Sequence, residues 1–185
     1  MDGGTEAYMR FLYGDEYGLE QVIELYKDSL IFFLMQYVKS AEVAEELTED
    51  TFVTLAVKKP IFTENAKFKT WLFTIARNKA INFLRSAAFR KCVPLEEAET
   101  VQALDCPEQL LLRQERYRAL YSAIDSLPKN QREMVYLVYF EDMSVAQAAA
   151  VIRKTQRQGI NILFRARQKL KSILQEEGFE YENKS

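Results

Sequence analysis

The chain has 185 residues, of which 48% are hydrophobic, six are Gly and four are Pro, and this composition favours folded helices over a disordered chain. It has no His and only two Cys. These counts argue against a structural zinc site and remove the commonest general base, so we expect no metal and no cofactor. No apolar run approaches the ~20 residues of a membrane span, and the N-terminus lacks an apolar signal core. We therefore expect a cytoplasmic protein without membrane insertion.

Charge is distributed unevenly along the chain. The formal net charge of −2 would by itself argue against a nucleic-acid partner. However, residues 67–91 and residues 153–175 each contain seven Lys or Arg and no Asp or Glu, whereas residues 1–66 contain 13 acids. Because local patches set the field that a ligand meets, the two basic windows predict two nucleic-acid-binding segments.

Three helices are expected before the first basic window, over residues 6–13, 19–38 and 41–58. A turn at Gly14–Gly18 separates the first two, and apolar residues recur at helical spacing in the second. The third helix carries five acids on its outward side, namely Glu42, Glu45, Glu46, Glu49 and Asp50. This side is either a solvated face or a docking surface for a basic protein partner.

A loop with two aromatic residues follows, over residues 59–69. Phe62 and Phe68 lie there among Lys59, Lys67 and Lys69. In a basic loop an aromatic side chain can stack on an unpaired base. Loop aromatics more often anchor the loop to the core, and we favour that interpretation.

The next expected helix begins at Thr70, extends past Arg85 and ends near Phe89. Its apolar side consists of Leu72, Phe73, Ala76, Ala80, Phe83 and Leu84. Its opposite side consists of Trp71, Thr74, Asn78, Asn82 and Arg85. A ring surface together with amide and cationic donors suits unpaired bases, but a solvated amphipathic helix fits the pattern equally well.

Residues 91–107 are acidic and bracketed by Pro94 and Pro107, which predicts a linker between two domains. Cys92 and Cys106 lie in this linker, and we expect no disulfide between them in a reducing compartment.

The second unit, residues 108–175, is expected to be helical. It has a helix that ends at Pro128, then helices over 129–140, 145–152 and 156–175, with Ser144 and Thr155 as N-caps of the last two. A tight turn at Arg153-Lys154 before a basic helix is typical of a helix-turn-helix. The inward side of the last helix comprises Gly159, Ile162, Leu163, Ala166 and Leu170. Its outward side comprises Arg157, Gln158, Asn161, Arg165 and Gln168, which are side-chain types that read base edges in duplex DNA.

The predicted fold is therefore all-α, with two small helical domains, residues 6–90 and 108–175, joined by a flexible linker. The second domain contains the helix-turn-helix.

Several segments together resemble the sigma factors of bacterial RNA polymerase, of the small extracytoplasmic-function type that has only the second and fourth sigma domains. The segment AEELTEDTFVTL resembles the polymerase-docking helix of that family, and KFKTWLFTIARNKAINFLR resembles its F-R-T-W-L-x-x-I-A-R-N segment. In the second half, LPKNQREMVYLVYFEDMSVAQAA and FRARQKL resemble the helix-turn-helix region. All of them occur in the family's order and spacing.

The resemblance implies three sites and a set of partners. Docking on core RNA polymerase would use Glu46, Glu49, Asp50 and Phe52. Opening and capture of the minus-ten promoter element would use Phe62, Lys67, Lys69, Trp71, Thr74, Arg77, Asn78, Asn82 and Arg85. Recognition of the minus-thirty-five element would use Arg153, Lys154, Arg157, Gln158, Asn161, Arg165 and Gln168. The implied partners are core RNA polymerase and promoter DNA, both double-stranded and melted. The resemblance leaves open whether an anti-sigma factor also binds. The protein would not be an enzyme.

The chain departs from the family pattern mainly in its second half. Asp142 and Arg153 stand where the family usually has Gly, and Phe164 stands where it usually has His. Ile160 and Ile162 replace the usual Lys and Arg, which would reduce phosphate contacts. We expect Arg153, Lys154, Arg157 and Arg165 to compensate.

Two other functions fit parts of the sequence. A stand-alone helix-turn-helix regulator would need only residues 108–175, and it would leave the first basic window and the acidic helix side without a role. A small helical enzyme with carboxylate clusters is the weakest alternative, because the sequence lacks His and a Gly-rich phosphate loop.

Overall fold

The computed structural model describes residues 3–61, 67–90 and 120–176, with side chains described up to Ser86 in the middle range. These residues form helices, turns and short connections, without a strand among them. The expected linker, both cysteines and Phe62 lie outside the described residues. The prediction of an all-α fold is confirmed.

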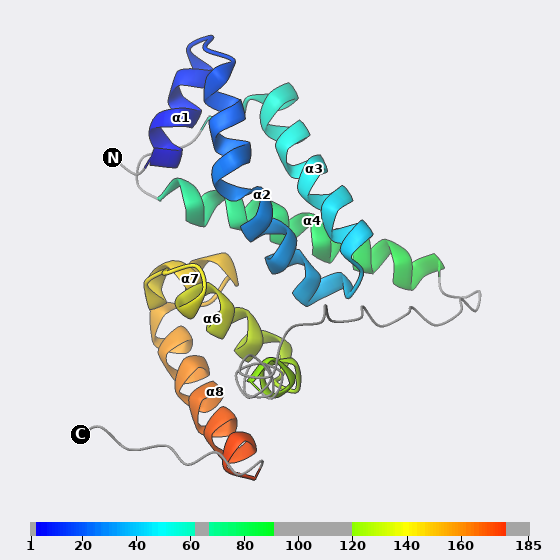
Figure 1. Ribbon diagram of the computed structural model, residues 1–185, viewed down its shortest axis with the longest axis vertical. Coiled ribbons are helices and arrows are strands. Elements are labelled where there is room, and N and C mark those ends of the chain that lie inside the picture. Colours follow the sequence, from blue (N-terminus) through cyan, green and yellow to red (C-terminus); the bar gives the residue numbers. More distant parts are fainter. Residues whose placement is uncertain (1–2, 62–66, 91–119, 177–185) are drawn as a thin grey trace, which may run out of the picture.

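The described part of the first domain contains four helices (Figure 1): α1 (Gly3–Leu12), α2 (Tyr17–Val38), α3 (Ala41–Lys58) and α4 (Phe68–Arg90). Helix α4 runs across α2 and α3 in this view. The predicted bounds agree to within three residues, the largest difference being the earlier start of α1.

The core of the first domain is built where α4 crosses α2. Phe33 and Leu34 of α2 and Leu72 and Phe73 of α4 are fully buried, and the rings of Phe33 and Phe73 are 5.1 Å apart between centroids. Phe68, the first residue of α4, is also fully buried. The interpretation of Phe68 as an anchor of its loop is therefore confirmed.

Tyr8 of α1 fixes the start of α4 from the other side. Its ring is fully buried and lies 5.1 Å from the ring of Phe68 and 5.5 Å from that of Trp71. Its hydroxyl donates a hydrogen bond to the carbonyl oxygen of Pro60, with 2.8 Å between the oxygens. Burial raises the pKa of Tyr8 to about 12, from the ordinary value of about 10.

This raised pKa predicts alkaline sensitivity of the first domain. A tyrosine that ionises more readily unfolded than folded contributes its full stability below pH 10 and loses it as the pH rises towards 12. The slope of unfolding free energy against pH is set by the number of protons released on unfolding. Between pH 10 and pH 12, Tyr8→Phe is expected to reduce that number by about one, as measured by denaturant unfolding. Tyr17→Phe is the control, because Tyr17 is 71% exposed, and it should leave the slope unchanged. Equal slopes for the wild type and Tyr8→Phe would contradict this expectation.

Within the described residues, the second domain contains the helical residues 120–125 and three further helices: α6 (Lys129–Tyr139), α7 (Val145–Val151) and α8 (Gln156–Glu176). Both predicted N-caps are confirmed. The Ser144 hydroxyl accepts from the Gln147 backbone N–H, and the Gln147 side chain accepts in return from the Ser144 N–H. Thr155 and Gln158 form the same reciprocal pair at the start of α8. Helices α7 and α8 therefore form the expected helix-turn-helix.

Two turns of this domain use left-handed backbone at residues with side chains. Asp142 has a φ of 51° and Arg153 a φ of 57°. These are two of the positions at which the chain departs from the glycine of the family pattern. Left-handed backbone costs about 1–2 kcal/mol for a residue with a Cβ, and Asp tolerates it better than Arg. Both turns therefore form without glycine, and the turn at Arg153 carries a cationic side chain.

Gly159 allows α7 and α8 to approach closely. A Cβ at this position would lie 2.7 Å from the Cβ of Ala149, a methyl group that cannot rotate away. We expect Gly159→Ala to lower the free energy of unfolding of the second domain by about 1–3 kcal/mol, as overpacked cores do. The neighbouring Ile160→Ala is the control, because Ile160 is 52% exposed and its truncation should cost less than about 0.5 kcal/mol. Similar midpoints for the two variants in urea unfolding would show that the helices can separate without cost.

Candidate nucleic-acid interface

The acidic side of α3 lies open to solvent. Glu46, Glu49 and Asp50 are all exposed, and Asp50 carries an ion pair with Lys79 of α4 at 3.6 Å between Nζ and Oδ2. Phe52 differs from its three predicted companions, because it is only 7% exposed and packs in the core. Phe52 can therefore position the helix, whereas only the carboxylates can meet a partner directly.

The side of α4 predicted to face unpaired bases is only partly open. Lys67, Asn82 and Arg85 are exposed, whereas Trp71, Thr74 and Asn78 are half-buried. The Trp71 ring lies 5.6 Å from that of Phe68, so part of its surface belongs to the core. The Thr74 hydroxyl donates to the Thr70 carbonyl oxygen of the preceding turn at 2.7 Å.

Lys69 and Arg77 differ most from the expectation of free cationic groups on this side. Arg77 is 8% exposed, and its Nη2 lies 3.5 Å from Oε2 of Glu133 in α6. Lys69 Nζ lies 2.8 Å from Oε2 of Glu141 and donates to the Glu141 carbonyl oxygen at 2.8 Å. Both cations are therefore engaged by acids of the second domain, which the sequence pattern did not predict.

The outward side of α8 has the predicted composition. Arg157, Gln158, Asn161, Arg165 and Gln168 are all exposed, and Gly159, Leu163 and Ala166 are buried as expected. Gln158 is also tied to the cap of the helix through Thr155. Phe164 was missing from the predicted set, although it is 60% exposed and lies on the same side of the helix as Asn161 and Gln168. Its helical spacing from those two residues was a signal available in the sequence.

The two candidate DNA-binding elements meet at a cleft between the domains. The cleft has a volume of about 480 Å³, and its lining includes Arg77, Asn78, Asn82, Arg85, Arg153 and Lys154. At its wall the Arg153 guanidinium donates from Nη2 to Oδ1 of Asn78 at 2.9 Å. Guanidinium, ammonium and amide groups suit phosphates and base edges. The structure thus joins the residues predicted for the minus-ten site with the turn predicted for the minus-thirty-five site.

In the described part of the chain, no cluster of three or more His, Cys, Asp or Glu side chains is arranged to hold a metal ion. No helix in that part is long and apolar enough to span a membrane.

These elements define a class of protein with two helical domains, one built on a long basic helix and the other on a helix-turn-helix. Residues 22–90 match the family Sigma-70 region 2, and residues 117–170 match the family Sigma-70, region 4. The chain belongs to the sigma-70 family and is a sigma factor of the extracytoplasmic-function type.

Relatives support this assignment over most of the chain. The chain is 26% identical over 156 residues to the ECF RNA polymerase sigma factor SigM of Bacillus subtilis, covering 84% of this chain and 94% of that protein. It is also 26% identical over 171 residues to the RNA polymerase sigma-H factor of Pseudomonas aeruginosa, covering 88% and 89%. The fold is similar to that of the sigma factor RpoE of Bartonella quintana, solved in complex with the anti-sigma factor NepR. The TM-score is 0.66 and the identity 24%, covering 84% of this chain and 96% of that one.

Proposed function

We propose that this sigma factor docks on core RNA polymerase through the acidic side of α3, opens the minus-ten element on α4 and reads the minus-thirty-five element as duplex through α8. It acts by binding alone and catalyses no reaction itself. An anti-sigma factor is a further partner in this proposal, as RpoE of Bartonella quintana was solved with one.

The observation that carries the proposal is the cleft between α4 and the helix-turn-helix, which gathers cations and amides and has no carboxylate among its described lining residues. Phosphates bind to the cations, and unpaired base edges bind to the amides. Asn82 and Arg85 are already exposed, so α4 offers both kinds of group to a melted strand.

The docking role of α3 is supported by the position of its carboxylates, which are exposed on a helix anchored in the core. Its exposed carboxylates project from the first domain on a helix that contributes Leu47, Phe52 and Leu55 to the core. A helix fixed in this way presents its charges without further ordering, which favours association with a basic surface.

The duplex-reading role of α8 rests on its exposed cations and amides, now joined by Phe164. Arg153 and Lys154 are exposed at the turn before α8, where they can compensate for Ile160. An exposed aromatic ring can contact the methyl group of thymine in the major groove. We therefore include Phe164 among the residues proposed to contact duplex DNA.

The proposal is tested by forming the complex of the protein with core polymerase, adding fragmented DNA of its own genome, and sequencing what is recovered. The expected result is a set of fragments that share a two-part element upstream of genes. Recovery of the same fragments by the protein without polymerase would instead indicate a stand-alone regulator. Failure of the protein to bind core polymerase at all would contradict the proposal.

A further inference from the structure

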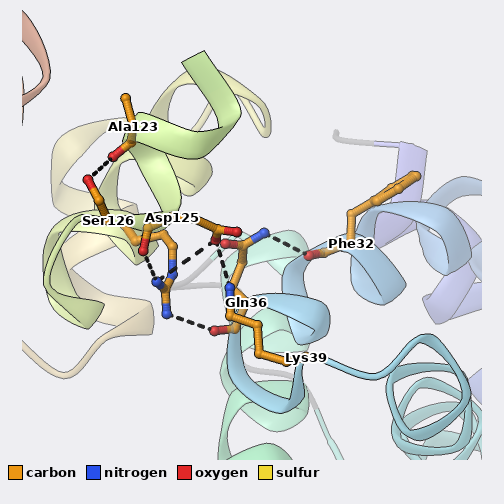
Figure 2. A network of polar contacts seen from close by, with 7 residues as sticks. Phe32, Gln36, Lys39, Ala123, Asp125 and Ser126 are labelled. Atoms are coloured by element: carbon orange, nitrogen blue, oxygen red, sulfur yellow. Dashed lines mark hydrogen bonds and ion pairs between the residues drawn. The ribbon is translucent and has the colours of Figure 1, made fainter. Parts of the chain in front are cut away.

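The cleft between α4 and the helix-turn-helix, called the interdomain cleft below, has walls from both domains. Polar contacts between α2 and the second domain hold these walls in place (Figure 2). Lys39, at the end of α2, forms an ion pair with Asp125, with 2.7 Å between Nζ and Oδ1. Arg132 of α6 donates from Nη2 to the Gln36 carbonyl oxygen of α2 at 3.1 Å. Because α6 is fixed in this way, Asn130 in its first turn lines the cleft opposite α4.

The charge of the interdomain cleft is positive. Arg85, Arg153 and Lys154 are exposed in its lining, and among the described residues none of the three forms an ion pair with an acid. The described lining contains no carboxylate. A concave wall of one charge sign focuses the electric field and raises the local concentration of small ions of the opposite sign. The cleft therefore suits an anion that carries several negative charges.

Arg77 adds a buried cation whose hydrogen-bonding groups are not all used. It is 8% exposed and lines the cleft, and its Nη2 lies 3.5 Å from Oε2 of Glu133. Hydrogen bonds between such charged groups are usually about 2.7–2.9 Å long. The Nε of Arg77 has no hydrogen-bond acceptor among the described residues. Since a buried cation is costly unless negative charge lies near it, Arg77 favours an anion in the cleft.

The other lining residues suit a ring that carries polar groups at its edge. Asn82 of α4 and Asn130 of α6 are exposed amides, and each can both donate and accept a hydrogen bond. Carboxamide side chains recognise the edges of nucleobases in this way. Ile81 and Ile152 add apolar surface to the lining. The volume of about 480 Å³ lies within the range of roughly 300–1,000 Å³ that is typical of small-molecule sites.

We propose that the interdomain cleft binds a free nucleoside polyphosphate. Its phosphates contact the three exposed cations, and its base contacts Asn82 and Asn130. The site needs groups from both domains but neither polymerase nor a promoter. Nucleotide binding is therefore a further activity of the free protein and stands apart from the proposed function. A bound nucleotide occupies residues of α4 that are also proposed to contact the melted strand, so the two ligands exclude each other there.

Calorimetric titration of the full-length protein with ATP and with GTP tests the proposal. The ionic strength is kept near about 0.15 M, so that attraction between distant charges is screened. Tripolyphosphate and the two nucleosides without phosphates are titrated in parallel. At least one nucleotide should bind about fivefold more tightly than tripolyphosphate and at least tenfold more tightly than its nucleoside. Absence of nucleotide binding, or equal affinities for the nucleotides and tripolyphosphate, would overturn the proposal.

A pair of charge variants locates the binding site. Arg85→Gln with Lys154→Gln removes two exposed cations of the cleft and should weaken nucleotide binding at least tenfold, because hydrogen bonds to charged groups are the stronger ones. Arg165→Gln with Lys171→Gln is the matched control. It removes the same two side-chain types from exposed positions of α8 outside the described lining, and it should bind within about twofold of the wild type. Equal nucleotide affinities for the two double variants would place binding elsewhere and overturn the proposal.

A second pair of substitutions separates recognition of the base from attraction of the phosphates. Asn82→Ala with Asn130→Ala changes two exposed residues and should leave the fold intact. It should weaken nucleotide binding about fivefold or more and leave the affinity for tripolyphosphate within about twofold of the wild type. An unchanged nucleotide affinity would overturn the assignment of the base. Failure of the proposed function would be seen separately, because these titrations contain neither polymerase nor DNA.

Discussion

Reversing the charge of Glu46 and Glu49 is expected to weaken binding of the protein to core RNA polymerase at least a hundredfold. Both carboxylates are exposed on a rigid helix, so each substitution places a cation against the basic surface proposed to receive it. Loss of two attractions and gain of two repulsions makes a loss of about 3 kcal/mol a conservative expectation. The affinity of Glu46→Lys with Glu49→Lys for polymerase can be measured by competition with the labelled wild-type protein.

The matched control places the same four units of charge elsewhere. Glu20→Lys with Glu24→Lys changes exposed acids of α2 and should reduce the affinity by less than about threefold. If the control weakens binding as much as the α3 variant, net charge rather than the acidic side of α3 determines docking.

Replacing Asn78 and Asn82 together by alanine is expected to reduce promoter opening by about tenfold or more, with polymerase binding unchanged. Each amide that contacts a base edge contributes about 1–3 kcal/mol of discrimination, and both amides line the cleft on α4. Opening can be followed by the reactivity of unpaired thymines to permanganate in the complex with polymerase. Asn78→Ala also removes the acceptor of the hydrogen bond from Arg153.

Trp71 is less suitable for this test than its place in the sequence suggested. Its ring packs on Tyr8 and Phe68, so truncation to alanine would destabilise the domain by an amount approaching the 3 kcal/mol or more that is usual for buried aromatic residues.

Gln175→Ala removes an exposed amide near the end of α8 and serves as the control for the asparagine pair. Opening that is equally strong in the asparagine variant and this control would show that another surface of the protein binds the melted strand.

The arrangement of helices could be predicted from the sequence because the determining signals are local. The bounds predicted for the third helix, residues 41–58, coincide with those of α3, because Lys59-Pro60 ends the helix. The N-caps at Ser144 and Thr155 placed the starts of α7 and α8. A cap and its partner lie within one turn, so no knowledge of tertiary structure is needed to identify them. Burial of Phe68 agrees with the general tendency of aromatic residues in loops to anchor the loop to the core.

The state of the candidate site could not be predicted in this way. Arg77 and Glu133 are 56 positions apart in the sequence, and Lys69 and Glu141 are 72 apart. Whether such groups meet depends on the packing of one domain on the other, for which helical periodicity carries no information. Met134 and Val135, which follow Glu133, are buried, but successive positions of a helix face different sides, so the burial of Glu133 itself could not be predicted from its neighbours.

The roles proposed for the two DNA-binding elements also differ in how well the structure supports them. On α8 the predicted outward residues are exposed and ready to bind, and Phe164 extends the set. On α4 the residues around Asn82 are open, whereas Arg77 and Lys69 are occupied. The helix that best matches the family pattern is therefore also the one most occluded in the free protein.

Reconstituted transcription shows whether this protein directs polymerase to promoters of its own genome. Purified core polymerase is incubated with genomic fragments, with and without the protein, and the 5′ ends of the transcripts are sequenced. We expect discrete start sites that appear only with the protein, share an upstream element and are lost with Glu46→Lys and Glu49→Lys. Transcripts that are the same with and without the protein would show that it does not direct initiation.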